Sequence, residues 1–124
     1  MSRPLGANFK IPHGLSNAML LPIVTQSSID GNIGRYADIA RHMGYNSGFS
    51  DKELATELVK RLKLLNSELK IPNLSEYGVD KAEFESAIPK MVGAAISSGS
   101  PANNPRVLSP EEMSDIYLRA ITIN

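Results

Sequence analysis

A stripe of leucines in the middle of the chain constrains the fold more than any other feature. It recurs at intervals of four and three residues and consists of Leu54, Leu58, Leu62, Leu65 and Leu69. This spacing places the side chains on one face of an α-helix. Just before it, Ser50 and Glu53 form a capping-box pattern, in which each side chain accepts a hydrogen bond from a backbone N–H at the helix start. The pattern predicts an amphipathic helix that begins after Ser50 and ends at Ile71-Pro72.

Two more helices are predicted ahead of this one. Residues Gly14–Gln26 are apolar on nearly every side, which is typical of a buried helix, and Pro22 is expected to bend it. Residues Ile33–Met43 carry an apolar stripe at helical spacing. Gly44 follows as a natural stop, because glycine readily adopts the left-handed conformation that ends many helices.

Two further helices are predicted in the second half of the chain. Asp80 and Glu83 form a cap pattern ahead of an apolar face, and Ser109 with Glu112 begins the last helix, with Pro110 at the favoured first position. The expected buried faces consist of Phe84, Ala87, Ile88, Met91, Val92 and Ala95 in one helix and Met113, Ile116, Tyr117 and Ala120 in the other. No convincing stretch alternates apolar and polar residues as a strand does. We therefore expect an all-α fold, an irregular bundle of about five helices, with residues 1–124 forming a single α-helical domain.

The charge balance and the residue types exclude several classes of function. Thirteen basic and thirteen acidic side chains cancel, so we expect no nucleic acid and no anionic membrane surface as a partner. The chain has no cysteine, which excludes disulfides and thiolate sites and favours a reducing, cytoplasmic location. The longest apolar run, Ala18–Val24, is too short to span a bilayer, and the first ten residues lack the apolar core of a signal peptide.

His13 is the first candidate for chemistry. It lies between Pro12 and Gly14 at the start of the first predicted helix, where the helix dipole disfavours a positively charged imidazole. Neutral imidazole is the form that binds a metal. From the residues alone, a simple helix-entry role is favoured, because one histidine makes no metal site. His42, the only other histidine, is expected on a solvated helix surface beside Asp38.

The remaining polar candidates favour structural roles. The segment Asn103–Arg106 could hold an anion, but Arg106 is more readily explained by bonds to loop carbonyls or a carboxylate. Gly31–Gly34 does not follow a strand and so does not form a phosphate-binding glycine loop. The tyrosines are expected in the core or at its rim, and no serine–histidine–aspartate arrangement is indicated.

Four segments in order resemble one known family. They are Pro4–Pro22, Arg35–Gly44, Leu62–Val79 and Asn103–Ile121, and the first contains the sequence PHG around His13. Together they resemble the C-terminal helical domain of the iron-containing alcohol dehydrogenases, whose fold is similar to that of dehydroquinate synthase. The resemblance covers essentially the whole chain.

The resemblance implies a two-domain oxidoreductase. An N-terminal α/β domain binds the nicotinamide cofactor, NAD(P), and the helical domain carries most of the site for iron or another divalent metal, which polarises the alcohol or carbonyl oxygen. The typical ligands are one aspartate and three histidines, and the resemblance makes His13 one of them. A further histidine ligand of the family lies in an H-x-x-x-H stretch just ahead of the segment that begins at Pro4. The second position of that stretch is Arg3 in this chain, and the first would fall before Met1. We therefore expect a fragment without the nicotinamide-binding domain, which on its own binds neither metal nor cofactor.

Two functions follow as hypotheses. The first is the C-terminal metal-site domain of an NAD(P)-dependent alcohol dehydrogenase-like oxidoreductase, inactive as an isolated chain. The second is a stand-alone, non-catalytic helical module for assembly or binding. We expect His13 at a helix N-terminus in or beside a concave surface, and residues 1–12 to be the part most free to move. We also expect a homo-oligomer, or a partnership with the missing N-terminal cofactor domain, because removing that domain would expose apolar surface.

Overall fold

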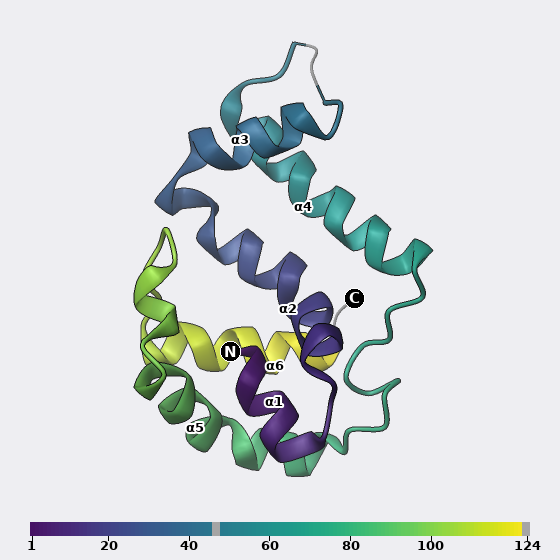
Figure 1. Ribbon diagram of the computed structural model, residues 1–124, viewed down its shortest axis with the longest axis vertical. Helices are drawn as coiled ribbons and strands as arrows, with labels where there is room; N and C mark the ends of the chain where they lie inside the picture. Colours follow the sequence, from purple (N-terminus) through teal and green to yellow (C-terminus); the bar gives the residue numbers. More distant parts are fainter. Residues whose placement is uncertain (46–47, 123–124) are drawn as a thin grey trace.

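The protein is all-α, as the sequence predicts. The computed structural model describes residues 1–45 and 48–122, and within these ranges every regular element is a helix (Figure 1). The elements in order are α1 (Ser2–Phe9), α2 (His13–Ser28), the 3₁₀ turn η1 (Ile29–Gly31), α3 (Ile33–His42), α4 (Asp51–Glu68), α5 (Lys81–Ser97), the 3₁₀ turn η2 (Ser100–Asn103) and α6 (Pro110–Thr122). The five predicted helices are all present, and α1 is a sixth that the sequence pattern did not indicate.

Helix α1 corrects the expectation for the N-terminal segment. It is only eight residues long, contains Pro4 and Gly6, and has no side-chain cap at Met1. Its stability comes from packing instead, because Leu5 is completely buried in the core. The Tyr117 hydroxyl donates a hydrogen bond of 2.7 Å to the carbonyl oxygen of Met1. Residues 1–12 were expected to be the part of the chain most free to move; in the structure, α1 packs against α2 and α5.

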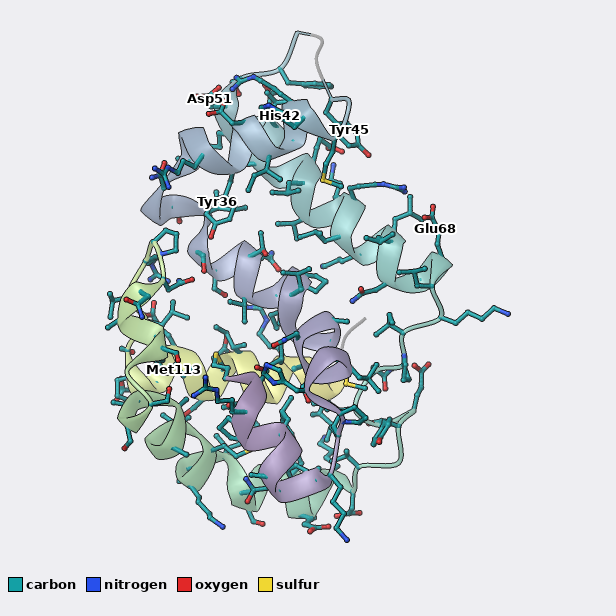
Figure 2. All side chains as sticks on the ribbon, viewed as in Figure 1. Tyr36, His42, Tyr45, Asp51, Glu68 and Met113 are labelled. Carbon is teal, nitrogen blue, oxygen red and sulfur yellow. The ribbon has the colours of Figure 1, made fainter. Side chains whose placement is uncertain are left out.

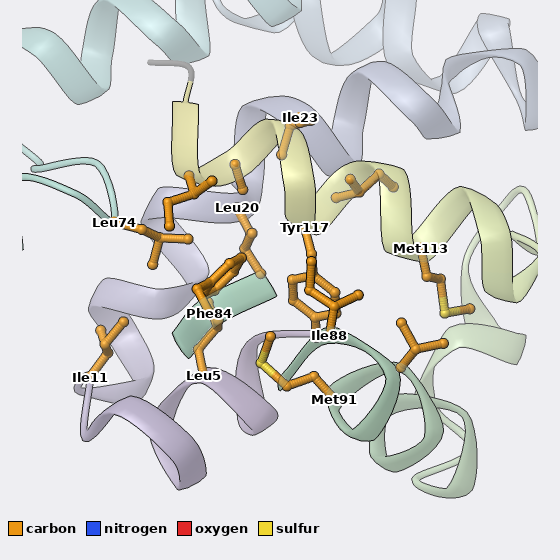
Figure 3. Close-up of a cluster of buried hydrophobic side chains, with 14 of the residues drawn as sticks. Leu5, Ile11, Leu20, Ile23, Leu74, Phe84, Ile88, Met91, Met113 and Tyr117 are labelled. Atoms are coloured by element: carbon orange, nitrogen blue, oxygen red, sulfur yellow. The ribbon is translucent and has the colours of Figure 1, made fainter. Parts of the chain in front are cut away.

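The main core lies where α1, α2, α5 and α6 meet (Figure 3). Phe84 on α5 is at its centre: its ring centroid is 5.4 Å from that of Phe9 and 6.2 Å from that of Tyr117, the latter in an edge-to-face arrangement. The predicted apolar faces of α5 and α6 are confirmed as buried, apart from a half-buried Ala87. Burial raises the pKa of the Tyr117 phenol well above its usual value.

A second, smaller cluster joins α3 to α4. It consists of Ala37, Ala40, Leu54 and Leu58, with Tyr36 and Tyr45 packed at its edge. The two helices form one end of the molecule (Figure 1), and α4 returns to the main body along α2, where the Asn66 side chain donates to the Ala18 carbonyl at 2.8 Å. The leucine stripe is therefore buried only at its start, and Leu69 at its end is 62% exposed.

The helix caps agree with the sequence patterns. The Glu53 carboxylate accepts a hydrogen bond of 2.8 Å from the Ser50 N–H, and the Ser50 hydroxyl accepts one of 3.4 Å in return. Ser109 and Glu112 form the same reciprocal pair at 2.8 and 3.2 Å. Asp80 accepts from the Glu83 N–H at 2.8 Å. Each pair satisfies backbone donors that have no partner inside the helix.

In the ranges described, none of the helices combines the length and apolar character that crossing a bilayer requires.

Candidate functional site

His13 is the first residue of α2, as predicted. Pro12 precedes it in an extended conformation, with φ −53° and ψ 139°, and the first turn contains no acidic residue and no side-chain cap. The His13 side chain is exposed to solvent. It therefore stands at the positive end of a 16-residue helix, with its ring outside the core.

The backbone around His13 is firmly held although its side chain is exposed. Ile11, two residues earlier, is buried in the main core. Ser16 is fully buried, and its hydroxyl lies 3.2 Å from the Pro12 carbonyl oxygen, to which it donates. These anchors on either side fix the position of the His13 backbone and leave the imidazole available for binding.

Asn17 is a polar neighbour of the imidazole. Its side-chain nitrogen lies 3.3 Å from His13 Nε2, so the amide can donate a hydrogen bond to that nitrogen when it carries no proton. Sequence reasoning missed this residue. The signal was present, because residues four apart on a helix lie on the same face.

Asn17 is also one of the residues that line a cavity of about 310 Å³. Its lining is mainly apolar and comes from the chain start, α2, and the stretch from η2 through the following loop into α6: Met1, Ser2, Asn17, Leu20, Leu21, Val24, Ser100, Pro101, Asn104, Leu108 and Met113. Figure 2 labels Met113 on the α6 side. His13 does not line the cavity, but its Nε2 lies within hydrogen-bond distance of Asn17, which does. We call this space the Asn17 cavity. An apolar cavity with a few polar groups at its edge is the usual form of a small-molecule site.

The described residues do not form a complete metal site. Across residues 1–45 and 48–122, no three His, Cys, Asp or Glu side chains are grouped so that they could hold a metal ion. His13 contributes one imidazole, whereas a bound divalent ion needs three or four protein ligands. The residues present therefore do not fit a metal ion on their own.

The second histidine belongs to the surface, as expected. His42 is exposed near the end of α3, and its Nδ1 lies 2.7 Å from the Asp38 carbonyl oxygen. Figure 2 shows it at the end of the molecule formed by α3 and α4, where Asp51 also lies. Arg41 forms ion pairs with Asp38 and Asp51 there. These are ordinary ion pairs of a solvent-exposed surface.

Arg106 has the structural role that the sequence favoured. Its guanidinium donates to the Ser27 carbonyl oxygen at 3.1 Å and pairs with Glu112. The Asn104 side chain donates to the Ser28 hydroxyl at 2.8 Å. Together these bonds fasten the loop after η2 to the end of α2. The pKa of Glu112 is lowered, first by the Ser109 N–H and then by Arg106.

Comparison with known proteins identifies one family throughout. The family model described as "Fe-containing alcohol dehydrogenase family, C-terminal" matches residues 1–121. The NADPH-dependent butanol dehydrogenase of Clostridium saccharobutylicum is 36% identical over 118 residues, which cover 94% of this chain and 30% of that protein. The lactaldehyde reductase of Escherichia coli (strain K12) is 36% identical over 119 residues, with coverage of 94% and 30%.

Solved structures give the same result for the fold. A 1,3-propanediol oxidoreductase superposes with a TM-score of 0.87 at 32% identity, over 96% of this chain and 31% of that one. The alcohol dehydrogenase from Oenococcus oeni superposes with a TM-score of 0.86 at 28% identity, over 96% and 30%. The chain thus spans about three-tenths of the length of the curated relatives named above.

Proposed function

The chain belongs to the Fe-containing alcohol dehydrogenase family as its C-terminal domain, and from this premise we propose that it is the metal-site domain of an NAD(P)-dependent oxidoreductase acting on alcohols or aldehydes. The single observation that carries the proposal is the position of His13. An exposed imidazole on a fixed backbone, within hydrogen-bond distance of a residue that lines an apolar cavity, is arranged to face a ligand rather than to fill a core.

His13 is the one metal ligand that we assign to this chain. The other ligands and the nicotinamide site are assigned to protein outside it, because the described residues make no complete metal site. By itself the chain is therefore expected to turn over no alcohol. With no cysteine in the sequence, we assign it to a reducing, cytoplasmic environment.

The Asn17 cavity is the proposed place for the apolar part of the substrate. Leu20, Leu21 and Val24 give it an apolar wall along α2, and Asn17 connects this wall to the imidazole. A substrate whose hydrocarbon chain lay here would have its oxygen close to the start of α2. Small alcohols and aldehydes have the size and polarity for such a site.

A chimera tests the role of His13. The 124-residue chain is joined to the remaining N-terminal part of the 1,3-propanediol dehydrogenase of Citrobacter freundii, a relative that is 34% identical to it. Metal content and 1,3-propanediol oxidation are then measured for the parent chimera, His13→Ala and His42→Ala. Loss of the ligand should weaken metal affinity by at least about a hundredfold, since even partners of ligands contribute ten- to a hundredfold. His42→Ala is the matched control and should change neither quantity.

Two results would contradict this function. Metal content that is equal in the parent chimera and in His13→Ala would remove His13 from the site. Turnover of an alcohol by the unmodified 124-residue chain would show that the missing ligands and cofactor site are not needed.

The second candidate, a stand-alone helical module without catalysis, is supported by the closure of the core. Among the described residues, every buried side-chain nitrogen or oxygen has a hydrogen-bond partner, and α1 covers the core with Leu5. The DNA upstream of Met1 distinguishes the two. An in-frame cofactor domain there supports the oxidoreductase, whereas a promoter and start site support the module.

We also propose that the chain associates, either with a second copy or with a cofactor domain. Several large apolar side chains are exposed, among them Leu21 on α2, Leu64 on α4 and Val107 ahead of α6. Leu21 is 47% exposed at the Asn17 cavity, where a partner would cover it. Burying such surface stabilises an interface by roughly 25 cal/mol for each Å².

A further inference from the structure

We propose that a second cavity, lined by α2, α4 and α6, binds a small organic anion through carboxylate or phosphate oxygens. The cavity has a volume of about 210 Å³ and shares no lining residue with the Asn17 cavity. Lys63 from α4, Arg119 from α6 and Gln26 from α2 reach it from three sides. We call it the Lys63 cavity. The inference does not depend on the proposed oxidoreductase function.

The charge of the lining selects an anion. Lys63 and Arg119 are both cations, and among the described residues no aspartate or glutamate lines the cavity. Helix α2 contains no acidic residue at all. The carboxylates of α4 that lie nearest to Lys63 in sequence are already paired, Glu57 with Lys60 and Glu68 with Arg61. Within the described ranges, the Lys63 ammonium forms no hydrogen bond or ion pair with the protein.

Arg119 is oriented toward the same space. One guanidinium nitrogen donates to Gln26 Oε1 at 3.3 Å, and the other lies 3.4 Å from the Asp115 carboxylate. Asp115 is 62% exposed, so water screens this pair. The planar guanidinium offers paired donors that match carboxylate and phosphate oxygens.

The remaining walls determine the shape of the ligand. Met19, Pro22 and Ile23 make an apolar floor along α2. Asn66 lies at the edge, held by its bond to the Ala18 carbonyl oxygen. The volume equals about seven water molecules at their share of liquid volume, which suits a molecule with a few carbon atoms and one anionic group.

An NMR titration of the ¹⁵N-labelled 124-residue chain tests the site at constant ionic strength. The probes are butyrate, inorganic phosphate and butyramide, the last being a neutral molecule with the shape of butyrate. We expect saturable shifts of the backbone amides of Met19, Ile23 and Ala120 with butyrate or phosphate, and none with butyramide. The stronger of the two anions identifies the headgroup.

Lysine variants locate the anion. Lys63→Gln should weaken binding at least about tenfold, the usual effect of losing a hydrogen bond to a charged group. Lys60→Gln is the matched control: Lys60 lies one turn away on α4, is 66% exposed, and does not line the cavity. Circular dichroism checks that both variants fold.

Three results would overturn the proposal. They are the absence of saturable shifts with either anion, equal shifts with butyramide, and equal weakening in Lys60→Gln and Lys63→Gln. The last would mean that the anions merely screen surface charge. None of these results bears on His13, so failure here leaves the proposed oxidoreductase function untouched.

Discussion

Replacing Leu5 by alanine tests whether α1 is an integral part of the core. Leu5 has no exposed surface and packs in the main cluster with α2, α5 and α6. The substitution removes most of a buried side chain and leaves a space that the short, Pro4-containing helix can fill only by moving. If α1 were loosely attached, the same change would cost almost nothing.

The expected loss is about 3 kcal/mol of unfolding free energy, because fully buried Leu→Ala changes cost roughly 2–5 kcal/mol. For a domain of this length, such a loss lowers the melting temperature by about 10 °C. It is a large share of a total stability of about 5–15 kcal/mol. Leu5→Met, which nearly conserves volume, should cost less than about 1.5 kcal/mol.

Urea denaturation followed by circular dichroism measures these losses. The matched control is Leu64→Ala, the same substitution at a helical position that is 50% exposed, where the expected change is within about 0.5 kcal/mol. A Leu5→Ala loss no larger than that of Leu64→Ala would refute the docking of α1 and return residues 1–12 to a loose segment.

Three further predictions concern glycines, pH and assembly. Gly31→Ala should destabilise the protein by about 1–3 kcal/mol, because its new Cβ would lie 2.5 Å from the carbonyl carbon and oxygen of Pro105; Gly93→Ala, with nothing within 4 Å of the new Cβ in α5, should stabilise it by up to about 1 kcal/mol. Thermal melts in which both variants shift the melting temperature in the same direction would contradict this. The pKa values of Glu53 and Glu112 are lowered, chiefly by the backbone N–H groups of Ser50 and Ser109. Their stabilisation is therefore present above the unfolded glutamate pKa of about 4.3 and is lost as the pH falls through the lower folded values. Glu53→Gln and Glu112→Gln should make denaturation midpoints less dependent on pH in this acid range, and unchanged acid profiles would show that the caps carry no such linkage. Light scattering at micromolar concentration should detect a dimer or larger species, whereas a monomer at every concentration tested would show that the exposed apolar residues need no cover.

Local sequence patterns were sufficient for most of the helices and their ends. Ser50 with Glu53 and Ser109 with Glu112 marked two helix starts correctly, because a capping box uses only residues within one turn. The buried faces of α5 and α6 were predicted from spacing alone, since each is a regular stripe on one helix. The all-α class and the family resemblance likewise needed no coordinates.

The candidate site was only half predictable. His13 was identified from its PHG segment, and the structure places it at the start of α2 as expected. Its neighbour Asn17 was within reach of helical spacing, but the Asn17 cavity was not. That cavity is built from four parts of the chain, including Met1 and Ser100, and their meeting depends on how the helices pack.

By itself, the sequence determined five of the six α-helices, how most helices begin, and which histidine stands exposed at a helix start, because these properties depend on neighbours within a turn or two. Tertiary structure alone decided the rest. It made a helix of residues 2–9, where burial of Leu5 supports a segment too short to be stable by its own hydrogen bonds. It left Leu69 in solvent although it continues the leucine stripe, because α4 extends past the helices that bury the start of that stripe. It also brought Lys63 and Arg119, which are 56 residues apart in the sequence, to one cavity, because such long-range proximity arises only when separate helices pack around a common core.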